Sequence, residues 1–397
     1  MNRVLFLLGL SIIINYIDRS NLSIAAPLIK NEMGITASQL GVLLSAFFWT
    51  YSLMQICSGW LVDRFDVKWV FAVGFFVWSA ATAVTGWLHG FVALLAARVL
   101  LGVGEAVSFP SYAKILGSYF DEKRRGYANS IVLAGLALGP AIGLLLGGSI
   151  VNRFGWRPFF VVVGLAGLVW LLPWFAWMPR REASAVVHSP FSDMFKIIGR
   201  LPAWGMWACH FSLAYPLYFL LTWLPFYLTR VRGLSLNQMA RVGALVFLVQ
   251  AATTAVAGRL SDYLIVSGGD VTRVRKSLVM VGSVIEGICL VAAVLSPSPY
   301  YVWMLAMAGF CMGLKGPTIY AAGQTIPGPR MVGRWMGLQQ CVGNLSGVVA
   351  PAVTGYLVDR THSFHWPFFL AAGISWLGIL SWLFAVGPIE TIEWQSQ

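Results

Sequence analysis

The sequence contains few charged residues. Only 11% of its 397 residues are Asp, Glu, Lys or Arg, whereas about a quarter are charged in an ordinary soluble domain. Apolar residues make up 58% of the chain, and the mean hydropathy is +0.75. This balance excludes a soluble enzyme, a nucleic-acid-binding domain and a disordered chain. It predicts an all-α polytopic protein whose surroundings are the lipid bilayer.

Several motifs are also missing. The five cysteines all fall in apolar stretches and form no CxxC pair, so we expect neither a disulfide framework nor a metal site. No HExxH and no GxxxxGK[ST] occurs, which argues against an intramembrane hydrolase and against ATP use. We therefore expect no enzymatic activity and no cofactor.

Twelve stretches are long and apolar enough to span a membrane, which takes about 20 residues each. They cover 4–29, 37–62, 69–88, 91–118, 126–152, 157–178, 202–229, 237–265, 277–296, 299–323, 332–358 and 364–387.

The net charge of +12 is distributed unevenly between the connecting loops. Of the 27 Lys and Arg residues, seventeen fall on the side of the amino terminus, seven on the other side and three within the spans. Because basic loops stay in the cytoplasm, we expect both termini to be cytoplasmic. We also expect the protein to be a monomer and to lie in the cell (inner) membrane. This basic excess does not indicate nucleic-acid binding.

The longest polar connection divides the chain into residues 1–178, a linker at 179–201 that could form an amphipathic helix, and residues 202–397. The two halves resemble each other. GWLVDR at 59–64 recurs as GRLSDY at 258–263, and GPAIG at 139–143 as APAVT at 350–354. Two pseudo-symmetric six-helix bundles are the arrangement of secondary transporters, which bind substrate between repeats.

Three longer motifs extend this interpretation. GWLVDRFDVKWV (59–70) resembles the loop motif of the major facilitator superfamily, and NYIDRSNLSIAAP (15–27) with ARVLLGVGEAVSFPS (97–111) and GNLSGVVAPAVTGYLVD (343–359) is similar to its anion:cation symporter branch. The resemblance implies proton-coupled import of a small organic anion such as a sugar acid. It implies proton coupling or substrate binding at Asp18, Arg19, Arg98 and Glu105, and substrate contacts at Tyr51 and Asn344.

Ionisable residues inside spans are costly and therefore suggest function. Six occur, namely Asp18, Arg19, Arg98, Glu105, Glu286 and Lys315. Arg98 and Glu105 share one helix face about 10.5 Å apart along the axis, so each can reach across to Asp18 or Arg19. If protonation of Glu105 or Asp18 leaves a guanidinium uncompensated, a substrate carboxylate can replace it. The alternative is a structural network that joins the two helices.

The remaining polar residues within the spans leave two interpretations open. Lys315 could contact substrate in the second half or reach towards an interface, and Glu286 has no obvious partner in the sequence and favours a structural role. Polar side chains at helical spacing could line a hydrated cavity or join helices; these are Tyr51, Tyr215, Tyr218, Gln340 and Asn344. His210 favours a packing or gating role.

Charges at the cytoplasmic helix ends could form a gate. Asp63 and Arg64 can pair with Arg124 or Arg125, and Asp262 belongs to the weaker copy of the same motif. Such pairs would break as the halves rock. The alternative is ordinary loop charge.

Two other functions stay open. An exporter or antiporter of hydrophobic or cationic compounds is suggested only by the glycine-rich stretch at 135–148, and it predicts an acidic cavity with few arginines. A transport-inactive sensor would keep the same fold. Neither the anion, nor the direction of transport, nor the choice between protons and sodium ions follows from the sequence.

Overall fold

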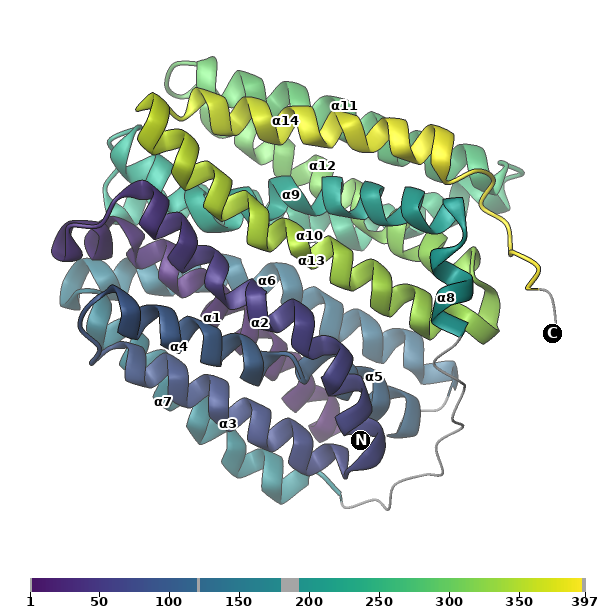
Figure 1. The fold of residues 1–397 in the computed structure, drawn as a ribbon, viewed down its shortest axis with the longest axis horizontal. Helices are drawn as coiled ribbons and strands as arrows, with labels where there is room; N and C mark the ends of the chain where they lie inside the picture. The colour runs from purple at the N-terminus through teal and green to yellow at the C-terminus, as the bar shows by residue number, and fades with distance from the viewer. Residues whose placement is uncertain (1, 120–121, 180–192, 395–397) are drawn as a thin grey trace. The chain divides into compact units, whose positions relative to one another are not determined.

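The computed structural model describes residues 2–119, 122–179 and 193–394, and these ranges contain helices and no β-strand (Figure 1). The helices are α1 (Asn2–Met33), α2 (Ala37–Arg64), α3 (Val67–Thr85), α4 (Phe91–Glu105), α5 (Ser108–Tyr119), α6 (Glu122–Phe154), α7 (Trp156–Trp177), α8 (Asp193–Ile198), α9 (Leu201–Arg230), α10 (Leu236–Val266), α11 (Val271–Leu295), α12 (Tyr300–Thr325), α13 (Gly328–Thr361) and α14 (His365–Leu380), followed by a π-helical turn at Ser381–Ala385.

Eleven helical stretches in the described ranges are long and apolar enough to cross a membrane. Each overlaps one of the predicted spans, so the prediction of an all-helical, multi-pass membrane protein is confirmed. The remaining predicted span, 37–62, coincides with α2, which is not among the eleven. The number twelve and the side of the membrane on which the termini lie stay predictions.

The predicted span at 91–118 is interrupted. Helix α4 ends at Glu105 and α5 begins at Ser108, with Ala106 and Val107 in a turn. The Ser108 hydroxyl donates to the carbonyl oxygen of Glu105 at 2.7 Å, which satisfies an acceptor that the interrupted helix leaves open. The interruption places a carboxyl-bearing residue at the end of a helix within the hydrophobic span.

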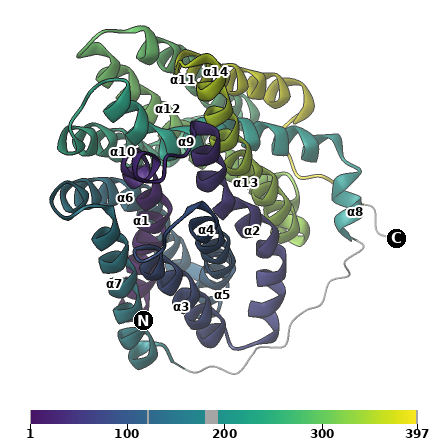
Figure 2. The same cartoon turned by 60° about the vertical axis from the view of Figure 1, so that its left-hand side comes forward.

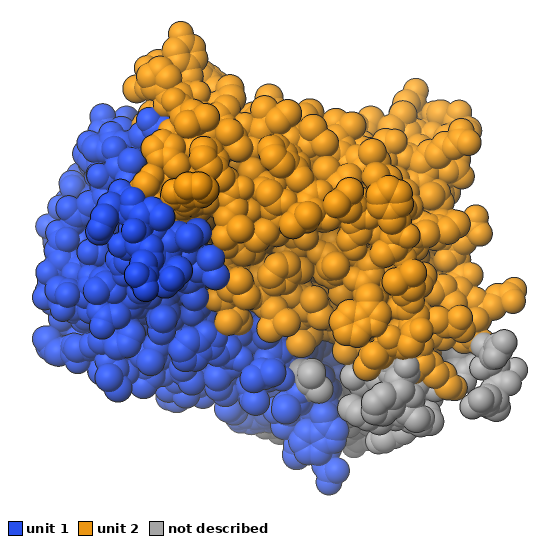
Figure 3. All heavy atoms as spheres, turned by 45° about the horizontal axis from the view of Figure 1, so that its top comes forward, with its two compact units in different colours: residues 1–187, 220–247, 351–362 blue, residues 188–219, 248–350, 363–397 orange. Residues whose placement is uncertain are grey.

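Contacts between Cα atoms divide the chain into two compact units, coloured separately in Figure 3. Unit 1 comprises residues 1–187, 220–247 and 351–362, and unit 2 comprises residues 188–219, 248–350 and 363–397. Unit 1 therefore holds one end of α9, α10 and α13 besides helices α1 to α7. The predicted division of the sequence at 179–201 stays a prediction.

Within unit 1, α1 packs on α6, α3 on α7 and α2 on α4 (Figure 2). Small residues make these approaches close. A Cβ atom on Gly139 of α6 would overlap the side chain of Tyr16 on α1, and one on Gly102 of α4 would overlap the Phe47 carbonyl oxygen on α2. Helices in lipid pack through such small residues because lipid gives them no hydrophobic drive to associate.

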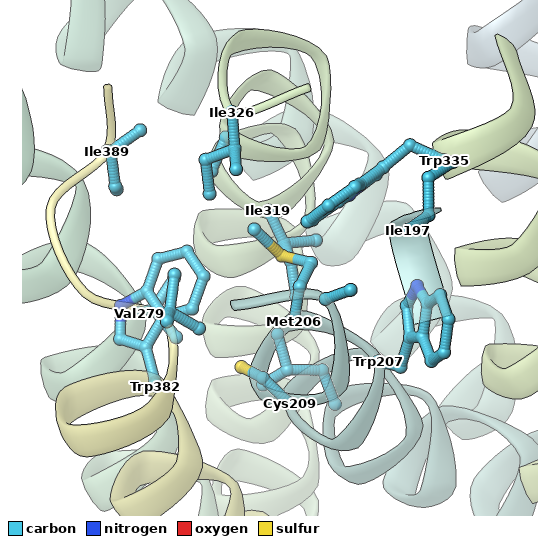
Figure 4. Close-up of a cluster of buried hydrophobic side chains, with 14 of the residues drawn as sticks. Ile197, Met206, Trp207, Cys209, Val279, Ile319, Ile326, Trp335, Trp382 and Ile389 are labelled. Carbon is cyan, nitrogen blue, oxygen red and sulfur yellow. The ribbon is translucent and has the colours of Figure 1, made fainter. Parts of the chain in front are cut away.

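Within unit 2, α11 packs against both α12 and α14. A buried hydrophobic cluster, partly drawn in Figure 4, joins α8 and α9 to the segment that follows α14. Its members include Ile197, Met206, Trp335, Trp382 and Ile389. Beyond this cluster the Ile392 amide donates to the Ile326 carbonyl oxygen at 2.8 Å, so the end of the described chain is fixed to the turn between α12 and α13.

Candidate functional site

A buried ion pair connects α1 to the end of α4. Arg19 Nε lies 2.9 Å from Glu105 Oε2, and the two side chains are 2% and 0% exposed. The interruption after Glu105 positions the carboxyl, and the close packing at Gly102 brings α4 against α2 beside it. Of the two pairings that the sequence left open for Glu105, the structure brings it together with Arg19.

Aromatic rings surround the Arg19 guanidinium. Its Cζ atom lies 4.3 Å from the Tyr51 ring centroid, 4.5 Å from that of Tyr16 and 5.1 Å from that of Phe47. Tyr51 is buried and stacks on Phe47 with centroids 5.0 Å apart. Ring faces stabilise a desolvated cation, so these residues help to keep Arg19 charged away from water.

Arg98 lies two helical turns before Glu105 and is also buried, at 4% exposure. Its Cζ atom lies 5.4 Å from the Phe47 ring centroid. Its Nε and Nη1 atoms are buried and have no hydrogen-bond partner among the described residues. A guanidinium always carries its charge and presents a fork of N–H donors that matches a carboxylate. Buried donors without acceptors are costly, so the Arg98 guanidinium has unused capacity to donate hydrogen bonds.

Asp18 is not paired with an arginine by any described hydrogen bond or ion pair. Its Oδ1 atom accepts from the Thr82 hydroxyl of α3 at 3.0 Å and from Asn21 Nδ2 at 3.3 Å. Its Oδ2 atom is buried and has no partner among the described residues. The four buried charges of α1 and α4 therefore form one ion pair, one carboxyl bound by neutral donors and one incompletely bound guanidinium.

The predicted polar residues of unit 2 form two hydrogen-bonded contacts. The Tyr218 hydroxyl donates to Asn344 Oδ1 at 2.7 Å, joining α9 to α13. The Tyr320 hydroxyl of α12 donates to Gln340 Oε1 at 3.2 Å. Tyr215 is buried beside Phe211. These bonds join helices, and a role of the same residues in solute binding stays a prediction.

His210 also belongs to this part of unit 2. Its ring meets the Tyr320 ring edge-on with centroids 5.5 Å apart, and a Cβ atom on Gly343 would lie 3.0 Å from its Nε2 atom.

Lys315 has a carboxylate partner in unit 2. Its Nζ atom lies 2.5 Å from Glu286 Oε2, and the Ser375 hydroxyl donates to the same oxygen at 2.5 Å. The two charged side chains are 2% and 0% exposed, and the Lys315 stem packs on Gly282. Glu286, for which the sequence offered no partner, thus joins α11 to α12 and α14 and neutralises Lys315.

The predicted gate is described only in part. The side chains of Asp63, Arg124 and Arg125 lie outside the described residues. Arg64 lies over the Trp60 ring, with 5.5 Å from its Cζ atom to the ring centroid, and Asp262 is exposed. The gate pairs stay predictions.

Sequence reasoning missed four neighbours of the predicted site, namely Tyr16, Phe47, Thr82 and Tyr320. Tyr16 and Phe47 were detectable in principle, because they stand three residues before Arg19 and four before Tyr51, on the same helix faces. Thr82 and Tyr320 carry no such signal, since each depends on how separate helices pack. Among the described residues no group of three or more His, Cys, Asp or Glu could hold a metal ion.

Similar proteins are transporters. The chain is 30% identical to the probable sulfoacetate transporter of Cupriavidus necator, over 98% of this chain and 94% of that protein. It is 29% identical to the hexuronate transporter of Bacillus subtilis, over 97% and 94%. It is 28% identical to the probable L-galactonate transporter of Escherichia coli, over 96% and 88%.

Solved structures share the fold. A bacterial homolog of the human lysosomal transporter Spinster, in an inward-facing and occupied conformation, superposes with a TM-score of 0.83 at 22% identity, covering 96% of both chains. The D-xylose-proton symporter gives a TM-score of 0.80 at 13% identity, covering 98% of this chain and 99% of that one. A model of the family described as the Major Facilitator Superfamily matches residues 8–269 and 242–393. The resemblance drawn from the motifs is thus confirmed: the chain is a transporter, not an enzyme, and it belongs to the Major Facilitator Superfamily.

Proposed function

We propose that this transporter is a proton-coupled symporter that imports a small organic anion by alternating access. The observation that carries the proposal is Arg98, a buried guanidinium whose Nε and Nη1 atoms have no acceptor among the described residues. The names of the relatives, which include sulfoacetate, hexuronate and galactonate transporters, support a carboxylate or sulfonate as the ligand.

Anion binding in this proposal begins at Arg98. Two N–H donors of one guanidinium face two oxygens of a carboxylate or sulfonate, a geometry that gives strong, charge-assisted hydrogen bonds. Phe47 lies beside both Arg98 and Arg19, and all three side chains are buried. In a medium of low dielectric constant the attraction between the guanidinium and the anion is stronger than in water. We expect Tyr51, through its place beside Arg19, to contact the same anion.

Proton coupling follows from the Arg19–Glu105 pair. When Glu105 takes up a proton, its ion pair with Arg19 is lost, and the Arg19 guanidinium becomes a second positive charge for the anion. Proton and anion therefore bind cooperatively, and each raises the affinity for the other by the same factor. Asp18, bound by neutral donors, is the second candidate for the proton.

The polar residues of the carboxy-terminal half enter as further predicted substrate contacts. Existing hydrogen bonds involve Tyr218, Asn344 and Gln340, and a hydroxyl-bearing solute can replace these bonds with its own. Tyr215 lies one helical turn before Tyr218 on the same face of α9. Lys315 is the weakest of the predicted contacts, because Glu286 balances its charge.

The topology completes the proposal. We infer that both termini are cytoplasmic in the inner membrane, because seventeen basic residues fall on the amino-terminal side of the predicted spans and seven on the other. The two six-helix halves would then alternate about the anion, with Asp63, Arg64, Arg124, Arg125 and Asp262 in the cytoplasmic gate, and the working unit would be a monomer.

The test is uptake into proteoliposomes under an imposed pH gradient, screened over sugar acids, sulfonates and monocarboxylates. We expect one anion to accumulate, and we expect Glu105→Gln to abolish gradient-driven uptake while anion counterflow survives. Glu390→Gln is the matched control, because it makes the same chemical change at an exposed position. Sodium substitution separates the two coupling ions. Exchange of cationic or neutral compounds without any anion would instead establish an exporter.

A further inference from the structure

The first turn of α2 has its amide groups satisfied from two sources. Its local cap is a reciprocal one: the Gln39 amide donates to Thr36 Oγ1 at 3.1 Å, and the Thr36 amide donates to Gln39 Oε1 at 2.9 Å. This capping box binds one of the open N–H groups of the helix. It leaves the amides of Ala37 and Ser38 to be satisfied from elsewhere.

A carboxylate from the far end of the sequence satisfies those two amides. Asp359, in the last turn of α13, accepts from the Ala37 amide through Oδ1 at 2.9 Å and from the Ser38 amide through Oδ2 at 2.6 Å. Both carboxylate oxygens are thus bound by a helix amino terminus, whose partial positive charge favours an anion. All of these residues belong to unit 1.

The backbones of α2 and α13 are also in direct contact at this point. A Cβ atom on Gly41 would overlap the Pro351 carbonyl oxygen, and one on Gly355 would overlap the Ala37 carbonyl oxygen. Only glycine allows such an approach from either helix. The Pro351 carbonyl oxygen in turn accepts from Trp223 Nε1 at 3.1 Å. The contact therefore combines two glycines with one bidentate carboxylate.

The sequence around Asp359 gives this contact further meaning. GYLVDR at 355–360 repeats the pattern of GWLVDR at 59–64, the loop motif at the opposite end of α2. The Asp359 contact lies where α1 has ended and α2 begins, at the far end of these helices from the amino terminus of the chain. Helix α2 thus ends in GWLVDR, and its first turn is bound by Asp359 of the similar sequence GYLVDR.

We propose that Asp359 is a conformational latch that holds this end of the transporter closed by capping α2. The inference rests on the proposed function only in requiring alternating access. For the closed end to open, the last turn of α13 must leave the first turn of α2, and water must replace the carboxylate on the two amides. Gly41 and Gly355 allow the backbones of α2 and α13 to touch in the closed arrangement, and the Asp359 carboxylate sets how readily this contact breaks.

The expected effect can be scaled from ordinary helix caps. Losing one aspartate cap shifts a folding equilibrium by roughly five-fold. Since the Asp359 cap exists only in the closed arrangement, we expect Asp359→Ala to raise the ratio of open to closed molecules by about the same factor. Asp359→Asn keeps one acceptor oxygen and loses the charge, so its shift is expected in the same direction and smaller.

The test measures a distance between spin labels in the full chain, reconstituted in lipid nanodiscs without substrate. Cys57 and Cys341, the two cysteines that are not buried, are first replaced by serine. Labels are placed at the exposed positions Asn31, near the end of α1, and Thr361, near the end of α13. We expect Asp359→Ala to increase the longer-distance population about five-fold over the parent chain.

Asp270→Ala is the matched control. Asp270 caps α11 by accepting from the Arg273 amide at 2.8 Å, a bond within its own helix. Replacing Asp270 removes a comparable cap, but that cap does not connect distant segments of the chain. The distance distribution should therefore not change. An unchanged distribution in Asp359→Ala, or an equal shift in Asp270→Ala, overturns the latch. If Asp359→Ala does not fold, Asp359→Asn decides on the same criterion.

This measurement separates the latch from the transport proposal. It involves neither an anion nor a proton gradient, so a wrong substrate assignment cannot alter its outcome. Conversely, anion uptake that depends on Glu105 can be established in proteoliposomes while the labels show no effect of Asp359. A second label pair at Asn31 and the exposed Asn152, both in helices of the amino-terminal half, should keep its distance in every variant.

Discussion

Replacing Glu286 alone should destabilise the protein far more than replacing Glu286 and Lys315 together. Glu286→Gln leaves the Lys315 ammonium buried at 2% exposure, without its carboxylate at 2.5 Å. Breaking one side of a buried pair costs about 3–5 kcal/mol, whereas replacing both charges by groups of similar volume is close to neutral. We therefore expect a loss of about 3–5 kcal/mol in Glu286→Gln and near recovery in Glu286→Gln with Lys315→Met.

The assay is reversible unfolding by SDS in mixed micelles, read by tryptophan fluorescence, for wild type, both single variants and the double variant. Glu32→Gln is the comparison, because Glu32 pairs with Arg157 at 2.7 Å with side chains 46% and 25% exposed. An exposed pair contributes about 0–1 kcal/mol. If Glu286→Gln lost no more stability than Glu32→Gln, the reasoning from burial would be refuted.

The same variants decide the role of Lys315. A lysine that serves only to balance Glu286 predicts that the double variant both folds and transports. A lysine that also contacts the substrate predicts that the double variant folds but loses uptake. Stability and transport therefore have to be measured on the same four proteins.

Three further predictions follow from single contacts. Arg98→Lys keeps the positive charge and loses the forked N–H donors of the guanidinium, so we expect the KM for anion uptake to rise about ten-fold or more. An unchanged KM in initial-rate uptake assays would be the contrary result. Tyr218→Phe removes one hydrogen bond to Asn344 and should cost about 0.5–1.5 kcal/mol in SDS unfolding; no loss would mean that the bond contributes nothing. Gly102→Ala forces a methyl group against the Phe47 carbonyl oxygen and should destabilise the protein by about 1–3 kcal/mol. A Tm equal to that of the wild type in thermal unfolding would contradict this expectation.

The positions of most membrane-spanning helices were predictable because their spans are apolar stretches of the required length. The predicted span at 202–229, for example, is α9 at Leu201–Arg230. The turn after Glu105 was not predicted, since hydropathy stays high through Ala106 and Val107 and the sequence carries no charge there. A break inside an apolar span depends on backbone bonds such as that from Ser108, which a hydropathy pattern does not detect.

The buried ionisable residues of the candidate site were predictable, and their pairings were not. Rarity alone singles out Arg19, Glu105 and Lys315, because ionisable residues in spans are few. Which charges meet depends on helix rotation and on packing between helices distant in sequence. Asp18 therefore meets Thr82 rather than an arginine, and Lys315 meets a carboxylate 29 residues away along the chain.

The two units solve the problem of buried charge in opposite ways. Helix α11 packs on α12 and α14 as α3 packs on α4 and α7, so the internal packing of the halves is similar. In unit 2 the two buried charges on these helices, Glu286 and Lys315, neutralise each other at 2.5 Å. The four buried charges of α1 and α4 in unit 1 also cancel formally, but the carboxyl of Asp18 and the guanidinium of Arg98 do not bind each other in any described hydrogen bond or ion pair. Two buried charges that neutralise each other resist the entry of a further ion, since the ion would have to displace an existing partner. We therefore expect anion binding and proton uptake at the amino-terminal helices, and the Glu286 and Lys315 variants test whether the charged pair of the carboxy-terminal helices has a structural role alone.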